Sequence, residues 1–147
     1  MPNTLHVAFR VGTAEYAIPA AQVLHLESFE AATHVPGAAK YVAGLVQVRG
    51  RVVPVVDLRV RFGLPPAPAG HELDRRVIVV QIGARIAGML VDSAREVVPL
   101  AASSFERPPV LIEERADGFV TAIATANKRL FLIVDVPRVI GEELEHD

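Results

Sequence analysis

The chain has 147 residues, of which 51% are hydrophobic and 5% aromatic, with no Trp, no Cys and a formal net charge of -2. This length fits one domain that can bury roughly 70% of its unfolded surface in an aliphatic core. The lack of cysteine excludes a disulfide framework, a thiolate metal site and a cysteine nucleophile, and the scattered Lys and Arg disfavour a general nucleic-acid surface.

The N-terminal sequence MPNTLHVAFRVG lacks the basic region and apolar run of a signal peptide. No stretch approaches the ~20 uninterrupted apolar residues of a membrane span. We therefore expect a cytoplasmic protein without direct membrane insertion.

The first quarter of the chain predicts two short strands and a third element. Residues 5–11 alternate with period two, as in a half-buried strand, and Gly12-Thr13 reverses the chain into residues 14–18. Residues 19–22 predict a helical turn, and the apolar run 23–29 is compatible with either strand or helix.

A long connection then leads to a predicted hairpin, Gly44–Val48 and Arg51–Val56, joined by a turn at Arg49-Gly50. Pro54 removes a ladder donor, which predicts an edge strand or a bulge. Asp57 is placed to cap a short helix that ends at Gly63.

The second half begins after a proline-rich loop, residues 63–70. Residues 77–82 and 85–91 predict a hairpin, followed by Asp92-Ser93 and a return strand that we expect to end at Pro99.

The last part is weakly patterned from residue 101 to 117, and a hairpin is predicted over Asn127-Lys128, between residues 118–124 and 129–134. Asp135 is a candidate N-cap of a short amphipathic C-terminal helix that carries apolar residues as far as Leu144. Many short strands with turns every eight to twelve residues indicate an all-β fold of small barrels.

Candidate catalytic chemistry is sparse. Asp57 and Asp92 lie in apolar surroundings, where acid/base work is one interpretation and capping of turns the favoured one. The five histidines show no metal-ligand spacing, and no serine has a nucleophile-elbow setting. We predict no enzymatic activity, no cofactor and no metal.

The motif from Gly44 to Gly63 resembles the CheW-like domain, the coupling module of bacterial chemosensory arrays. The matching positions are Arg49, Gly50, Pro54, Asp57, Leu58, Arg59, Phe62 and Gly63. The resemblance extends from the Phe9 strand through Glu15-Tyr16, residues 77–80 and 88–93, to residues 130–140.

This resemblance implies a single domain over residues 1–147, with two intertwined five-stranded SH3-like barrels side by side and short helices. We place the approximate halves at residues 1–20 plus 76–147 and at residues 21–75. The implied function is a non-enzymatic adaptor. A groove between the barrels would take the cytoplasmic tip of a chemoreceptor, and exposed strands would pair with the regulatory domain of a CheA-type histidine kinase or with other CheW-like domains.

Carried over by motif, the receptor-binding positions are Val23, His25, Arg49, Val77, Gly88 and Ala94. From local sequence alone, Arg49 fits a solvated turn residue as well as a donor to a partner carboxylate, and Val23, Val77 and Ala94 fit an ordinary core. Gly50, Pro54, Asp57 and Asp92 belong to the structural motif. His25 stands where the family often has Glu, which changes what a partner can offer there.

Two other hypotheses remain at this point. The protein could be a family member that keeps only one of the two partner surfaces, or a small-barrel binder of single-stranded nucleic acid, against which the few aromatics and the acidic balance count.

Overall fold

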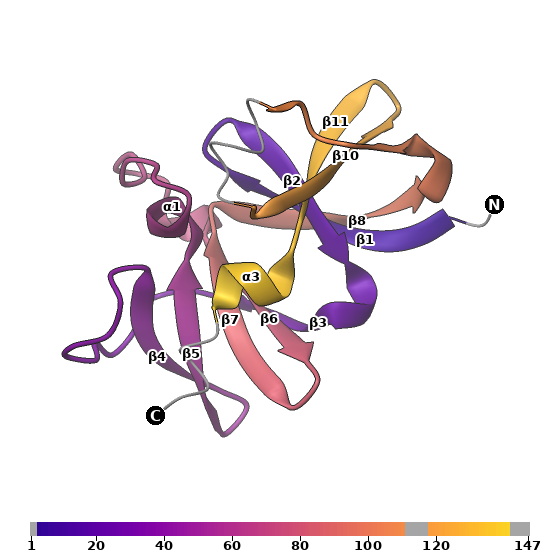
Figure 1. Cartoon of the computed structure of the whole chain (residues 1–147). Helices are drawn as coiled ribbons and strands as arrows, with labels where there is room; N and C mark the ends of the chain where they lie inside the picture. The colour runs from indigo at the N-terminus through magenta and orange to yellow at the C-terminus, as the bar shows by residue number, and fades with distance from the viewer. Residues whose placement is uncertain (1–2, 111–117, 142–147) are drawn as a thin grey trace.

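The computed structural model describes residues 3–110 and 118–141, and these form two β-sheets with a few short helices (Figure 1). The six-stranded sheet has the order β8-β1-β2-β11-β10-β9 and the five-stranded sheet has the order β3-β6-β7-β5-β4. The predicted all-β class is confirmed.

The strands of the six-stranded sheet are β1 (Asn3–Val11), β2 (Ala14–Pro19), β8 (Ser93–Ala101), β9 (Phe105–Glu106), β10 (Val120–Ala126) and β11 (Arg129–Val134). Those of the five-stranded sheet are β3 (Val23–Ser28), β4 (Val42–Val48), β5 (Arg51–Asp57), β6 (Arg76–Ile82) and β7 (Arg85–Val91). Among the described residues the helices are α1 (Leu58–Arg61) and α3 (Val136–Ile140), with 3-10 turns at Ala20–Gln22, Glu72–Asp74 and Ala102–Ser104. Leu144 lies outside the described residues.

The chain passes between the two sheets at Asp92. Strands β6 and β7 hydrogen-bond into the five-stranded sheet, so this sheet is built from the continuous segment 23–91. The predicted halves divide the chain at residue 76, whereas the two sheets divide it at Asp92, between β7 and β8. The hairpin 77–91 is held by pairing of β6 with β3 and of β7 with β5.

Each sheet contains one parallel pair among antiparallel neighbours. In the six-stranded sheet β2 pairs with β11, with Tyr16 opposite Leu132. In the five-stranded sheet β5 pairs with β7, with Val55 opposite Gly88. The first pairing joins a strand near the start of the chain to the last strand that the structure describes, whereas β5 and β7 are separated in the sequence by α1, a 3-10 turn and β6.

The position of Pro54 differs from the prediction of an edge or a bulge, because β5 lies between β7 and β4. Parallel pairing with β7 begins one residue later, at Val55. Counted from Val48 and Arg51, which close the two-residue turn, Leu45 and Pro54 form a non-hydrogen-bonded pair. The missing N–H therefore removes no ladder bond.

Pro99 does not end its strand as predicted. Strand β8 continues to Ala101, and Pro99 pairs with Leu5 of β1. Strand β8 is an outer strand and has no neighbouring strand on its open side. A proline is tolerated in such a strand because its missing N–H need not take a hydrogen bond away from a neighbour.

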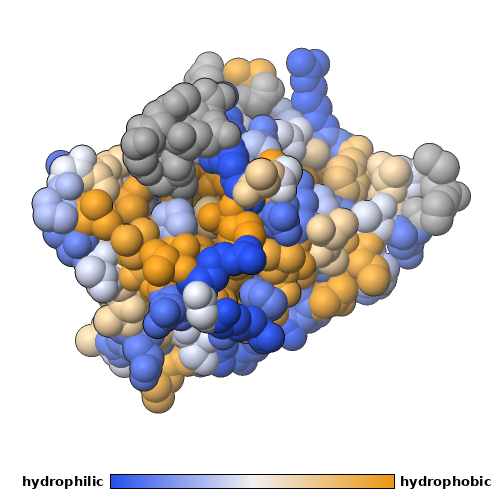
Figure 2. All heavy atoms as spheres, turned by 90° about the horizontal axis from the view of Figure 1, so that it is seen from below, coloured by the Kyte–Doolittle hydropathy of each residue, from blue (hydrophilic) through white to orange (hydrophobic). Residues whose placement is uncertain are grey.

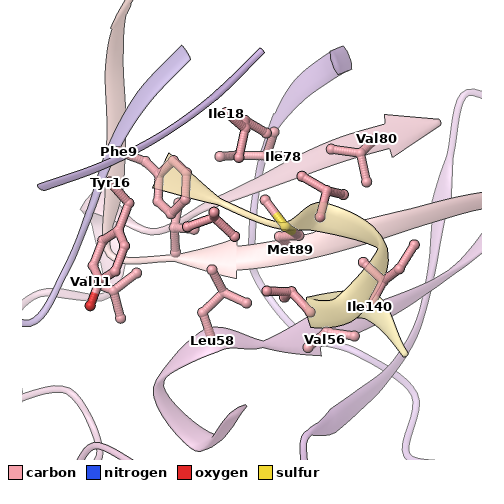
Figure 3. Close-up of a cluster of buried hydrophobic side chains, with 14 of the residues drawn as sticks. Phe9, Val11, Tyr16, Ile18, Val56, Leu58, Ile78, Val80, Met89 and Ile140 are labelled. Carbon is pink, nitrogen blue, oxygen red and sulfur yellow. The ribbon is translucent and has the colours of Figure 1, made fainter. Parts of the chain in front are cut away.

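The largest hydrophobic cluster lies where the two sheets and α3 meet (Figure 3). Phe9 and Ile18 come from the six-stranded sheet, Ile78 and Met89 from the five-stranded sheet, and Ile140 from α3. All five side chains are at most 2% exposed. Two smaller clusters contain residues of one sheet each, around Phe131 and around Val53.

Helix α3 is fixed at both ends. The carboxylate of Asp135 accepts a hydrogen bond from the backbone N–H of Arg138 at 3.3 Å, which confirms the predicted N-cap. At the other end Arg61 donates to the carbonyls of Val139 at 2.9 Å and Arg138 at 3.0 Å, and Arg85 donates to the carbonyl of Gly141. These arginines satisfy carbonyls that a helix end leaves free.

Candidate protein-binding site

The β4–β5 hairpin presents Arg49 at the far end of the five-stranded sheet. Arg49 and Gly50 have φ angles of 52° and 79°, the left-handed pair of a two-residue hairpin turn. Such a turn holds the side chain outside the sheet, and that of Arg49 is 68% exposed. The turn predicted from Arg49-Gly50 is confirmed.

An ion pair connects this turn to the opposite edge of the same sheet. The Nε of Arg49 donates to Oε2 of Glu27 on β3 at 3.3 Å. Strands β3 and β4 are the two ends of the sheet order, so the contact shows that the sheet curls until its edges approach each other.

Two hollows lie beside this closure. His25 and Arg49 line one of about 300 Å³ together with Gln81. Glu27 and Val77 line the other, of about 280 Å³. The structure therefore brings together His25 and Arg49, two of the six residues predicted to bind a receptor.

Strand β3 exposes apolar side chains next to these hollows. Val23, His25 and Glu27 are half-buried, whereas Leu24 and Leu26 are 41% and 44% exposed. Because β3 is an outer strand, its free backbone edge and its leucines are open to a partner. Figure 2 shows a broad apolar area on the face of the molecule seen from below, crossed by hydrophilic residues.

Three of the predicted contact residues lie inside the molecule. Val77 is 1% exposed and belongs to the cluster around Val53, and Ala94 is 9% exposed in the largest cluster. A Cβ added at Gly88 would lie 2.6 Å from Cγ1 of Val77. These residues shape the barrel beneath the surface, and their contact with a receptor stays a prediction.

Asp57 makes the capping contacts expected of it. Its Oδ1 accepts hydrogen bonds from the backbone N–H groups of Arg59 at 2.9 Å and Val60 at 3.5 Å, at the start of α1. This geometry assigns the side chain to the helix N-terminus.

Asp92 joins the two sheets. It accepts the N–H of Gly12 at 2.8 Å, and Arg59 donates to its two oxygens at 2.9 and 2.6 Å. Burial acts to raise the pKa of the Asp92 carboxyl, but the bonds from Arg59 and Gly12 outweigh it and hold the pKa below its usual value. A bidentate, charge-assisted pair in this position is a structural contact.

Sequence reasoning did not single out Glu27, Leu24 or Leu26. The alternation of polar and apolar residues from Val23 to Ser28 could have indicated that Glu27 shares a face with His25. Its pairing with Arg49 depends on the curl of the sheet, which no local pattern reveals.

Within residues 3–110 and 118–141 there is no group of three or more His, Cys, Asp or Glu that could hold a metal ion. None of the helices in this part of the chain has the length and hydropathy needed to cross a membrane. The hollows and the exposed leucines of β3, on a protein built from two packed β-sheets, describe a surface suited to contact with other proteins.

Residues 6–144 match the family model of the CheW-like domain. The chain belongs to this family and is a chemotaxis scaffold protein. It is 33% identical over 137 residues to the chemotaxis protein CheW of Bacillus subtilis (strain 168), covering 93% of this chain and 86% of that one.

A second relative, the chemotaxis protein CheW of Klebsiella aerogenes, is 28% identical over 137 residues, covering 92% of this chain and 80% of that one. The crystal structure of the scaffolding protein TtCheW from Thermoanaerobacter tengcongensis superposes with a TM-score of 0.85 at 28% identity, covering 97% of this chain and 94% of that chain. The likeness confirms the predicted pair of SH3-like barrels, although one of the two sheets has six strands instead of the predicted five, because the two-residue strand β9 is added at its edge.

Proposed function

We propose that this protein is a non-enzymatic adaptor that couples chemoreceptors to a CheA-type histidine kinase. The observation that carries the proposal is the family match over residues 6–144. It is supported by His25 and Arg49, which line the same hollow of the five-stranded sheet. Neither role needs a catalytic side chain. The adaptor supplies a coupling free energy between two binding sites, typically ~1–3 kcal/mol.

Arg49 is the residue best placed to contact the receptor tip. Its guanidinium has five N–H donors in a planar fork, of which Nε is used by Glu27. The pair is largely exposed, so its exchange for a partner carboxylate costs little. Val23, His25 and the exposed leucines of β3 would surround this contact.

Val77, Gly88 and Ala94 would act on receptor binding from below the surface. Val77 forms part of the wall of the hollow that Glu27 borders, and the missing side chain of Gly88 gives Val77 room. Substitutions at these positions would change the shape of the wall.

The test is calorimetric titration of the purified chain against a receptor cytoplasmic fragment and, separately, against the regulatory domain of the kinase. We expect both to bind, and we expect Arg49→Ala to weaken receptor binding about tenfold while leaving kinase binding unchanged, because one charged contact is lost. Lys40→Ala, an exposed cation on the β3–β4 connection, is the control.

Binding to only one partner would identify a one-sided family member. Binding to neither, with salt-sensitive retention on single-stranded DNA, would replace the proposal by the nucleic-acid hypothesis.

A further inference from the structure

A cleft of about 700 Å³ lies at the junction of the two sheets, and none of the six predicted receptor-binding residues lines it. Its walls come from the β1–β2 turn, from α1 and the proline-rich loop that follows it, and from the start of β8 (Figure 1). We name it the Arg10 cleft and define it by Arg10, Arg59, Leu64, Pro66, Arg75 and Arg95.

The Arg10 cleft is positively charged in a protein whose net charge is negative. Four arginines line it, with two aspartates, Asp74 and Asp92, and His71. With the histidine neutral, the lining carries two positive charges (4 − 2 = 2), against -2 for the whole chain. The concentration of positive charge in a concave site favours an anionic ligand.

Not all of these charges are available. Arg59 uses its donors on both oxygens of Asp92 and on the carbonyl of Pro65 at 2.8 Å. Arg95 contacts Asp74 at 3.1 Å, but both side chains are more than half exposed, 74% and 52%. A pair this exposed is weak and leaves Arg95 able to exchange partners.

Arg10 and Arg75 have unused hydrogen-bonding capacity. In the part of the chain that the structure describes, the exposed side chain of Arg10 makes no hydrogen bond, and its charge helps to lower the pKa of Glu15, opposite it on β2. Arg75 lies over the ring of Phe29 and forms a long ion pair with Asp57 at 3.8 Å, and its buried Nε has no hydrogen-bond partner among the described residues. Guanidinium N–H groups that make no hydrogen bond at a cleft can donate to the carboxylate or phosphate oxygens of a ligand.

The shape of the cleft favours an extended ligand. Leu64, Pro65, Pro66 and Pro68 give it an apolar wall. Arg10 and Arg95 also border a second, smaller hollow of about 90 Å³ that Glu15 and Glu96 line as well, so the positively charged part of the surface ends at these two arginines. An apolar wall beside spaced cations matches a peptide with acidic and apolar side chains better than a single small anion.

We propose that the Arg10 cleft binds an acidic peptide segment of a protein partner, whose carboxylates pair with Arg10, Arg75 and Arg95 while its apolar side chains pack on the proline-rich loop. The cleft lies at the junction of the sheets, where the family resemblance implies a receptor groove, but it contains none of the six carried-over receptor-binding residues, so its binding of a peptide is tested apart from the proposed adaptor function.

The test is fluorescence anisotropy of the full chain with a labelled synthetic peptide, Glu-Leu-Glu-Glu-Leu-Glu. A second peptide with Gln in place of each Glu keeps the shape and removes the charge. We expect saturable binding of the acidic peptide alone, and a loss of about tenfold or more in the double variant Arg10→Ala/Arg95→Ala, because two charged contacts disappear. Both side chains are exposed, so the variant keeps its fold. Arg51→Ala, which removes an exposed cation outside the cleft, is the matched control.

The proposal would be overturned by equal binding of the glutamine peptide, by an equal loss in Arg51→Ala, or by no binding at millimolar peptide. Displacement of the peptide by inorganic phosphate at micromolar concentration would also overturn it, by identifying a small-anion site. Receptor and kinase titrations are separate measurements, so failure here leaves the adaptor function untouched.

Discussion

Two arginine–carboxylate pairs lie at different ends of the five-stranded barrel. They share the same chemistry but differ in burial and in the number of hydrogen bonds. At the junction with the other sheet, Arg59 holds Asp92 through two hydrogen bonds, and the side chains are 13% and 22% exposed. At the hairpin end, Arg49 meets Glu27 through one contact of 3.3 Å, and the side chains are 68% and 31% exposed.

The surroundings explain the difference in role. At the junction, Asp92 also binds Gly12 and Arg59 also binds Pro65, so removal of either charge leaves several polar groups without partners. At the hairpin end, water can replace either partner. The junction pair therefore stabilises the arrangement of the sheets, and the hairpin pair remains available for recognition.

The largest effect should come from breaking the junction pair. We expect Asp92→Ala to lower the free energy of unfolding by about 2–3 kcal/mol, since a half-buried guanidinium and the N–H of Gly12 lose their acceptor. Urea denaturation at pH 7 measures this. Asp74→Ala, which removes the carboxylate of an exposed pair with Arg95, is the control and should change stability by less than about 0.5 kcal/mol. Equal losses of stability in the two variants would contradict the structural role given to the junction pair.

A substitution in the interior of the five-stranded barrel should lower the free energy of unfolding almost as much. Gly88→Ala should cost about 1–3 kcal/mol, because the new Cβ would meet Cγ1 of Val77 at 2.6 Å. Val77→Ala removes that methyl group, so the double variant should be less destabilised than the sum of the single variants. A double-mutant cycle by urea denaturation tests this, and strict additivity would show that the two side chains do not conflict.

Acid should weaken the junction pair selectively. The pKa of Asp92 is lowered in the folded protein, so its contribution is complete above the ordinary carboxyl pKa of about 3.9 and is lost as pH falls through the folded value. The stability difference between the natural protein and Asp92→Asn should be constant from pH 7 to 5 and shrink below about pH 4. Urea titrations at pH 7, 5, 4 and 3 measure it, and a difference that is as large at pH 3 as at pH 7 would refute the assignment.

The smallest effect is expected at the hairpin end. Glu27→Gln should change the free energy of unfolding by no more than about 0.5 kcal/mol, because it removes one exposed pair. The measurement is urea denaturation beside Asp92→Asn, the equivalent substitution at the junction. If Glu27→Gln proved the more damaging of the two, Arg49 would have a structural role instead of a binding one.

Sequence patterns predicted the features that depend on neighbouring residues. The β4–β5 hairpin, its turn at Arg49-Gly50 and the helix caps Asp57 and Asp135 all follow from local chemistry. Pro54 and Pro99 were misjudged because the effect of a proline depends on which strand lies beside it.

Contacts between distant segments could not be predicted in this way. Arg59 and Asp92 are 33 residues apart, and Arg49 and Glu27 are 22 apart. For the candidate site, the family resemblance points to His25 and Arg49 as receptor-binding residues, which stays a prediction. Local sequence leaves Val77 and Ala94 open between core and surface, and the packing places both in the interior.

The discontinuous make-up of the six-stranded sheet has a consequence for the order of folding. The five-stranded sheet uses the continuous segment 23–91, whereas β2 can complete its pairing only after β11, which ends at Val134, has been made. During synthesis the five-stranded sheet has all its strands long before the six-stranded sheet can close. Pairing between such distant segments carries the loop-closure cost that slows folding. We therefore expect β1 and β2 to remain incompletely paired until nearly the whole chain has been made, which makes the first strands of the chain among the last to reach their final partners.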